Sequence, residues 1–294
     1  MKLGSILPYY GSKRSMASTI VEELGPPTSY WEPFCGSLAV ILTKPKTPHE
    51  TVCDLNSDLA NLAATMADSR VGAKLLRELR RLPASEKVFE GACYRLKKLK
   101  PFSFYTFYDQ ARDYFIQSWL GRNGITGAAG GGNSFCVRYT PNGGPTATRW
   151  KSAVNSISGF RRRLRDVTIL CRSAFDVLPK ISDESGVVIY CDPPYLAKSK
   201  PYIHDFSESD HTRLAMELSR FQRARVVVSY YDHPWLATLY PGWTVRKLSR
   251  HKNMSNAGGA QQSAGNKIAP EVLLTNGPSY AKAPQKLLGE MELL

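Results

Sequence analysis

The chain has 294 residues, of which 43% are hydrophobic and 11% aromatic, enough for a packed core in one large domain or two small ones. No apolar stretch approaches the roughly 18 residues of a membrane-spanning helix, and the first ten residues lack the apolar run of a secretory signal, which excludes a membrane protein and a secreted miniprotein. The formal charge of +14 favours an anionic partner, most often a nucleic acid, over a surface that is only well solvated.

Strands and helices alternate through the first 67 residues. Ser12 and Ser15 are candidates to cap the first helix, and Pro26-Pro27 ends it, because a proline cannot continue a helix. The predicted elements are a helix to Glu23, a strand at 29–33, a helix at 38–43, a strand at 51–54 and a helix at 57–67. Such alternation favours an α/β fold with a parallel sheet.

The middle of the chain, about 70–165, has a different composition. A basic helical segment over 71–99 and a basic helix over 149–165 enclose an aromatic segment of helical spacing at 105–120. Between them, 121–144 is rich in Gly, Asn, Ser and Thr and too long for an ordinary turn, which is typical of a functional or disordered loop.

From residue 167 the alternation of strands and helices returns. The predicted elements are strands at 167–171, 186–191, 224–229, 243–248 and 271–275, with a helix at 209–221. The run 186–191 is almost continuously apolar, as expected for a parallel strand buried on both faces. The sequence therefore predicts a basic module inserted between two parts of one α/β sheet.

Six cysteines and five histidines show no metal-ligand spacing. None of the cysteines forms a CxxC pair, so we expect free thiols in a cytoplasmic protein and predict no metal site.

The segment Asp192-Pro193-Pro194-Tyr195 directly follows a predicted buried strand. Ligands of doubly wound sheets bind beyond the carboxyl ends of the strands. The two prolines fix the backbone and lack N–H groups, so carbonyls of this turn are left to face a ligand. With the carboxylate and the aromatic ring, they suit a planar base that carries an amino group. A rigid loop with an exposed acid is the other interpretation.

Together with the N-terminal turn, these residues resemble the Dam-like, D12 class (alpha-group) DNA N6-adenine methyltransferases. The segment 192–195 is similar to the family's motif IV, Tyr9-Tyr10-Gly11-Ser12-Lys13 to its motif X, and Glu32-Pro33-Phe34-Cys35-Gly36-Ser37 to its motif I. The resemblance covers nearly the whole chain and is strongest at 6–62 and 187–202. It implies a Rossmann-like S-adenosylmethionine-dependent methyltransferase sheet with an inserted, mainly helical target-recognition domain.

The resemblance also implies domain boundaries. The catalytic methyltransferase domain would comprise 1–62 and 166–294, and the DNA target-recognition domain 63–165. The resemblance also places the enzyme in the cytoplasm of a prokaryotic or phage-infected cell, where DNA is the substrate.

The methyl donor implied by the resemblance is S-adenosylmethionine. Gly36 would let the backbone approach the methionine portion, and Asp54 would accept hydrogen bonds from the ribose hydroxyls. Asp176 resembles the motif III acid near the adenine, but it is equally well placed to cap a helix. The implied cofactor-binding residues are Tyr9, Lys13, Pro33, Phe34, Gly36, Asp54, Asp176 and Asp192.

The implied reaction moves a methyl group to N6 of an adenine flipped out of the duplex. The amino group would donate to the Asp192 carboxylate and the Pro193 carbonyl, and Tyr195 would stack on the base. An Asp before Pro-Pro-Tyr favours adenine over the N4-cytosine enzymes, in which Ser is typical, and no Pro-Cys dipeptide supports a C5-cytosine enzyme. The implied catalytic residues are Asp192, Pro193, Pro194 and Tyr195.

The basic module is expected to hold double-stranded DNA, although a solvated helix face is the other interpretation of each cation. Ile125 and Thr126 replace an aromatic residue and an Asn that lie beside the family's target sequence, so a GATC target does not follow. No membrane partner is expected, and the oligomeric state stays open. The candidate DNA contacts are Arg122, Asn123, Arg138, Arg149, Lys151 and Arg162, with Arg161, Arg163 and Arg165 as further phosphate contacts.

Three other functions compete with DNA methylation. The first is an RNA or protein methyltransferase of the same fold, and the second is a non-catalytic DNA-binding relative. The third, a dinucleotide oxidoreductase, is disfavoured because no GxGxxG follows the first strand.

Overall fold

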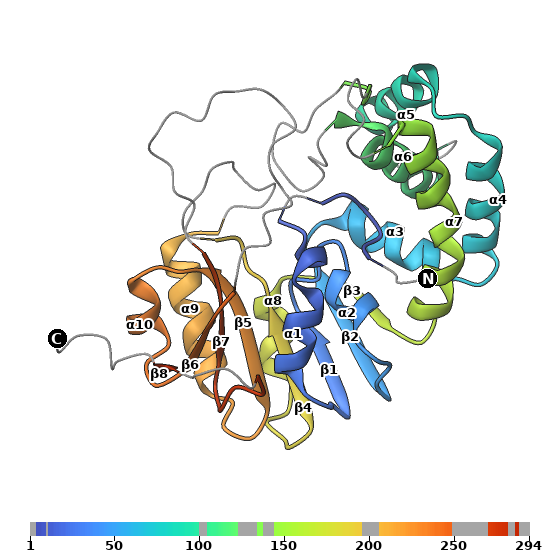
Figure 1. Ribbon diagram of the computed structural model, residues 1–294. Coiled ribbons are helices and arrows are strands. Elements are labelled where there is room, and N and C mark those ends of the chain that lie inside the picture. The colour runs from blue at the N-terminus through green and yellow to red at the C-terminus, as the bar shows by residue number, and fades with distance from the viewer. Residues whose placement is uncertain are drawn as a thin grey trace, which may run out of the picture.

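One sheet organises the molecule. The computed structural model describes residues 4–9, 11–99, 105–122, 134–137, 144–195, 206–248 and 270–281, with the backbone of 286–287. Within them, the strands follow the order β3-β2-β1-β4-β5-β7-β6-β8, and the first five of this order are parallel (Figure 1). The strands are β1 Ser29–Glu32, β2 His49–Asp54, β3 Thr168–Cys171, β4 Val187–Cys191, β5 Arg225–Tyr231, β6 Thr244–Lys247, β7 Glu271–Thr275 and β8 Lys286–Leu287.

Helices cover both faces of this sheet, and four of them form a separate group. Helices α4–α7 gather beside the β2–β3 edge, where they pack on α3 (Figure 1). The helices are α1 Ala17–Leu24, α2 Ala39–Thr43, α3 Ser57–Ala67, α4 Val71–Arg81, α5 Glu86–Lys98, α6 Phe107–Leu120, α7 Thr146–Leu164, α8 Ala174–Val177, α9 Glu208–Ser219 and α10 Trp235–Leu239, with short 3-10 helices η1 Lys13–Ser15 and η3 Leu178–Lys180.

The central strands bury both of their faces. On β4, Val188 and Tyr190 belong to the core cluster that includes α1, α2 and the helical group, whereas Ile189 and Cys191 belong to the cluster that includes α8, η3 and α9. All five residues of β4 are buried. This explains why the strand is an unbroken apolar run in the sequence rather than an alternating one.

The predicted α/β fold with an inserted helical segment is confirmed, while two local predictions are wrong. Neither Ser12 nor Ser15 caps α1, whose preceding residue Met16 makes no side-chain cap bond. The Ser12 hydroxyl instead lies 2.7 Å from the Ser37 hydroxyl. The basic segment 71–99 is two helices, α4 and α5, because Pro83 interrupts it and Ser85 caps α5.

Buried polar contacts attach the helical group to the sheet. Arg163 of α7 donates two hydrogen bonds to the Glu50 carboxylate on β2, at 2.5 and 2.8 Å, and Lys44 reaches the same carboxylate at 2.6 Å. The Asn56 side chain caps α3 and lies within hydrogen-bond reach of the Tyr114 hydroxyl on α6. The helical group is therefore held against the sheet by side chains that are themselves shielded from water.

No helix within the described ranges is long and apolar enough to cross a membrane. All six cysteines are free thiols. The described residues contain no cluster of three or more His, Cys, Asp or Glu side chains arranged to hold a metal ion.

Candidate active site

A cavity of about 290 Å³ opens where the chain leaves the carboxyl ends of β1, β2 and β4. Strand β1 pairs with β2 on one side and β4 on the other, so this is the point at which the strand order reverses. The cavity is near the lower end of the range for small-molecule sites, ~300–1,000 Å³. The turn Glu32–Ser37 and the segment Asp192–Pro194 both line it.

The turn after β1 has a backbone conformation that few residues adopt. Gly36 has φ +44°, and its N–H donates to Oδ2 of Asp54 at 2.8 Å. Oδ1 of Asp54 accepts from the N–H of Asn56 at 2.9 Å. Asp54 therefore fixes the turn while its carboxylate lines the cavity. Leu38, which precedes α2, has φ +60°, an uncommon conformation for a buried Leu.

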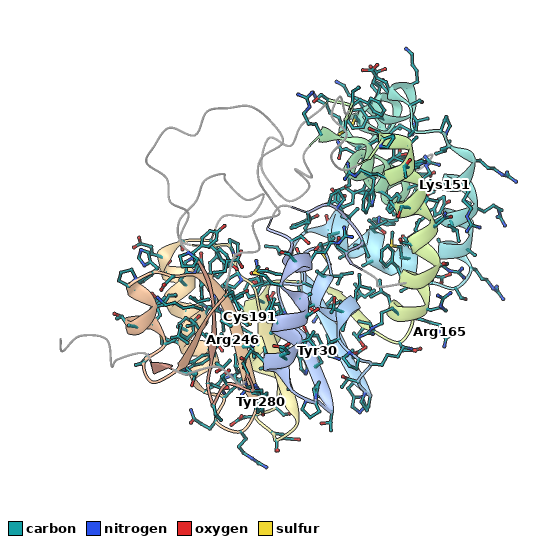
Figure 2. The ribbon with its side chains drawn as sticks, in the orientation of Figure 1. Tyr30, Lys151, Arg165, Cys191, Arg246 and Tyr280 are labelled. Atoms are coloured by element: carbon teal, nitrogen blue, oxygen red, sulfur yellow. The ribbon has the colours of Figure 1, made fainter. Side chains whose placement is uncertain are left out.

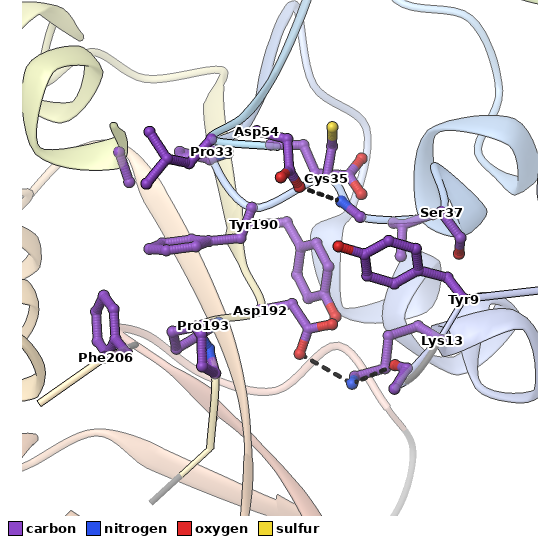
Figure 3. A pocket seen from close by; sticks show the side chains of 18 of the residues that line it. Tyr9, Lys13, Pro33, Cys35, Ser37, Asp54, Tyr190, Asp192, Pro193 and Phe206 are labelled. Atoms are coloured by element: carbon purple, nitrogen blue, oxygen red, sulfur yellow. Dashed lines mark hydrogen bonds and ion pairs between the residues drawn. The ribbon is translucent and has the colours of Figure 1, made fainter. Parts of the chain in front are cut away.

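Opposite this turn, Lys13 and Asp192 form a close ion pair. Nζ of Lys13 lies 2.9 Å from Oδ1 of Asp192 (Figure 3). It also lies 3.8 Å from the Glu271 carboxylate. Burial disfavours the charge of Lys13, but Asp192 and Glu271 beside it raise the pKa of Lys13 above its ordinary value. Lys13 is thus a buried cation in the cavity wall.

A second donor reaches the same carboxylate oxygen. The Ser229 hydroxyl on β5 donates to Oδ1 of Asp192 at 2.8 Å and lies 2.9 Å from the Tyr190 hydroxyl on β4. Ser229 is fully buried, and Tyr190 lines the cavity.

Tyr195 lies behind the cavity rather than in its wall. Its ring is 4% exposed and meets Tyr231 edge-on with ring centroids 4.5 Å apart, while Nζ of Lys13 lies 4.7 Å from its centroid. Its hydroxyl donates to Glu271 at 3.2 Å. A base could reach the face of this ring only if the neighbouring atoms moved aside.

The end of the cavity away from Lys13 is aromatic. Phe206 lies there (Figure 3). Phe175 and Phe206 stack with ring centroids 5.9 Å apart and an interplanar angle of 9°, and Phe34 meets Phe206 edge-on at 5.9 Å. Flat apolar surfaces of this kind suit a planar ring.

Two ionisable groups of the cavity wall are strongly perturbed. Burial raises the pKa of Glu32 to about 8, with a further contribution from Asp192, although the Tyr30 hydroxyl donates to Glu32 at 2.8 Å. Burial, and the nearby Asp54 carboxylate, raise the pKa of Tyr9 well above its usual range. Such groups are typical of functional sites.

The lining residues fit S-adenosylmethionine by their chemistry. The aromatic end offers stacking for an adenine, and the Asp54 carboxylate offers acceptors for ribose hydroxyls. The Asp192 carboxylate offers negative charge for a sulfonium, and Lys13 offers positive charge for a carboxylate.

The structure brings most of the sequence-predicted site together. The predicted residues that line the cavity are Tyr9, Lys13, Pro33, Phe34, Gly36, Asp54, Asp192, Pro193 and Pro194. Asp176 is exposed on α8 and Tyr195 is buried behind the wall, and neither lines the cavity. Ser173 caps α8, so the cap considered for Asp176 is supplied by another residue.

The sequence did not single out several residues that belong to this site. Phe175 and Phe206 form the aromatic end, and Ser229 and Glu271 reach Asp192 and Tyr195 from strands β5 and β7. Of these four residues, only Phe175 has a local signal in the sequence, because it adjoins the predicted Asp176. Ser229 and Glu271 are 37 and 76 residues from their partners, and nothing in the sequence marks these contacts.

The predicted DNA contacts are spread over the helical group. Arg122 is exposed just after α6, Arg149 is half-buried near the start of α7, and Lys151 and Arg162 are exposed on α7. Asn123 and Arg138 lie outside the described residues. Arg163, expected among the phosphate contacts, is instead buried and bound to Glu50, so that expectation is wrong.

Comparison with known proteins gives consistent results. The profile of the D12 class N6 adenine-specific DNA methyltransferases matches residues 9–253. The chain is 26% identical over 273 residues to the retron Ec67 DNA adenine methylase of Escherichia coli, covering 91% of both chains. It is 27% identical over 267 residues to a DNA adenine methylase of Serratia marcescens, covering 84% of this chain and 93% of the relative.

Proposed function

The chain belongs to the D12 class N6 adenine-specific DNA methyltransferases, and we propose that its cavity holds S-adenosylmethionine beside an adenine presented to Asp192 and Pro193. The family assignment makes the chain an enzyme that methylates adenine in DNA. One observation supports the site: the turn after β1 and the Asp192–Pro194 segment line the same cavity. The residues that suit the cofactor thus adjoin those that suit the reacting amino group.

The residues of the cavity divide into two sets in this proposal. Phe34, Phe175 and Phe206 hold the adenine of the cofactor, while Asp54 binds the ribose and fixes the turn. When bound, S-adenosylmethionine supplies the methyl group. Lys13 and the carboxylates near it orient the charged portion of the cofactor.

Asp192 and the Pro193 carbonyl accept the two hydrogens of the amino group of adenine. These bonds draw the lone pair of N6 out of conjugation with the ring and stabilise the positive charge that develops on N6. Methyl transfer would form the bond between N6 and the methyl carbon as the methyl–sulfur bond breaks, with its electron pair left on sulfur, and N6 would then release one proton. The residues around Asp192 would contribute mostly by aligning the amino group. Because N6 is inaccessible in a stacked duplex, the base is flipped out, and Tyr195 stacks on it once its ring is uncovered.

We also propose that the helical segment within 63–165 is the target-recognition domain, with the remainder as the catalytic domain. Its proposed DNA contacts among the described residues are Arg122, Arg149, Lys151 and Arg162. We propose Asn123 and Arg138, which lie outside the described residues, as further contacts. The bacterial relatives support a cytoplasmic place of action.

The test is nucleoside mass spectrometry of unmethylated plasmid DNA after incubation with the protein and S-adenosylmethionine. We expect N6-methyldeoxyadenosine with the wild type, none without the methyl donor, and at least a ~100-fold lower rate for Asp192→Ala. Asp166→Asn, which changes an exposed acid outside the cavity, is the control and keeps the wild-type rate.

Other products would change the assignment. N4-methylcytosine would contradict the role given to Asp192 while leaving the fold intact. No modified deoxynucleoside, with modification of RNA or protein instead, would overturn the proposed substrate.

A further inference from the structure

The Asp192 carboxylate is held through one oxygen. Oδ1 accepts from the Ser229 hydroxyl at 2.8 Å and from Nζ of Lys13 at 2.9 Å. No donor among the described residues reaches Oδ2. A carboxylate with one oxygen fixed by two donors cannot rotate freely, so the second oxygen has a defined direction. Figure 3 shows the pair with Lys13 at the cavity wall.

The direction of the hydrogen bonds behind Asp192 follows from counting protons. The Ser229 hydroxyl has one proton, and a carboxylate offers only acceptors, so this proton goes to Asp192. The Tyr190 hydroxyl, 2.9 Å from Ser229, must therefore donate to it. The result is one chain of bonds from Tyr190 through Ser229 to Asp192, in which each donor polarises the next.

The sheet itself puts this chain in place. Strands β4 and β5 are parallel with Cys191 opposite Val228, which sets Ser229 beside Asp192 at the carboxyl edge. Ser229 is fully buried and has a short side chain, so little freedom is lost when it holds the carboxylate.

Lys13 by itself is less suited than Ser229 to fix the Asp192 carboxylate. Its ammonium is shared among Asp192, Glu271 and the ring of Tyr195, at the end of a flexible side chain. A ligand that drew Lys13 toward itself would leave Ser229 as the remaining donor to Oδ1.

We propose that Ser229, supported by Tyr190, is a positioning residue for methyl transfer, which fixes Oδ1 of Asp192 so that Oδ2 receives the amino group of the target adenine. This inference rests on the proposed function. It assigns the two carboxylate oxygens different tasks: Oδ1 is anchored to the protein, and Oδ2 meets the substrate.

The experiment compares steady-state methylation by the wild type, Ser229→Ala and Tyr190→Phe. We expect kcat of Ser229→Ala to fall roughly 10–100-fold, because a hydrogen bond to a charged group is lost. KM for DNA and for S-adenosylmethionine should change less than about 3-fold. Tyr190→Phe should lower kcat in the same direction by less, again with little change in either KM.

A buried hydroxyl elsewhere in the sheet gives the matched control. Thr275 on β7 is 1% exposed and donates to the Gly277 carbonyl; it pairs with Val227, two residues before Ser229 on β5. Thr275→Val should lower Tm but leave kcat unchanged. The inference is overturned if Ser229→Ala keeps the wild-type kcat, or if Thr275→Val lowers kcat as much as Ser229→Ala does for an equal loss of Tm. A wild type that methylates no DNA would overturn the proposed function instead.

Discussion

Glu32 is an acid whose surroundings differ strongly from water. It is 2% exposed at the end of β1, where burial raises its pKa to about 8 against an ordinary value of 4.5. At a pH between about 4.5 and about 8, the folded protein keeps a proton on Glu32 that the unfolded chain releases. The contribution of Glu32 to stability is therefore lost as the pH rises from about 4.5 to about 8, and it is constant above that.

Glu32→Gln removes this titration while the side chain keeps its size. The free energy of unfolding of the variant, relative to the wild type, should increase between pH 5 and pH 8 by up to about 4 kcal/mol. Urea unfolding at four pH values in that interval measures it. Glu184→Gln, which changes an exposed acid before β4, is the control. A difference between Glu32→Gln and the wild type that stays constant with pH would contradict the argument.

At the scale of elements, the contact between β2 and α7 depends on a buried carboxylate. Arg163 is 8% exposed and bonds both oxygens of Glu50, and Lys44 approaches one of them. Burial raises the pKa of Glu50, but the bonds from Arg163 and Lys44 outweigh burial and lower it overall. Removal of one of these cations leaves the negative charge of Glu50 buried with less positive charge to offset its desolvation.

Arg163→Met should therefore destabilise the protein by about 3 kcal/mol, because it keeps the packing of the side chain but removes its charge. Chemical denaturation monitored by circular dichroism gives this value. Arg162→Met changes the neighbouring exposed arginine and should stay within about 0.5 kcal/mol of the wild type. If Arg163→Met and Arg162→Met lowered the free energy of unfolding equally, the Glu50 carboxylate would need no cation from α7.

The sequence predicted elements well where the signal was local. The helix at 57–67 was placed correctly because Asn56 caps it and its apolar residues repeat with helical spacing. The strand 187–191 was recognisable because burial on both faces demands an apolar run. The break at 82–85 was missed, although Pro83 and Ser85 signal it, because the charge pattern continues through it.

Long-range partners could not be predicted in the same way. Arg163 has the same local context as Arg161 and Arg162, and only the packing of α7 on β2 decides which of them is buried. Likewise, the motif at 192–195 was readable, but its buried support from Ser229 depends on the register of two strands. Chemistry concentrated in a turn is visible in sequence, whereas chemistry assembled across a sheet is not.

At the scale of the whole molecule, positive charge extends well beyond the cavity. Figure 2 labels Lys151 on α7 and Arg165 just after that helix, both well away from Cys191 at the end of β4. Lys151 and Arg162 are both exposed, and no carboxylate in the described part of the chain pairs with either. A phosphate contact at this face would involve DNA beyond the segment that carries the target adenine, and would act through charge rather than sequence.

Loss of both charges should accordingly weaken binding in a way that depends on salt. If Lys151 and Arg162 each neutralise one phosphate, Lys151→Gln with Arg162→Gln lowers the slope of log affinity against log salt concentration by about 2. Fluorescence anisotropy with a long duplex, from low to physiological salt, measures that slope. Lys180→Gln with Arg223→Gln removes the same charge from two exposed residues outside α4–α7, one at the end of η3 and the other just before β5. This double variant should leave the slope unchanged. If both double variants lowered the slope equally, net charge alone would draw DNA to the protein, and the α7 face would have no specific role in binding.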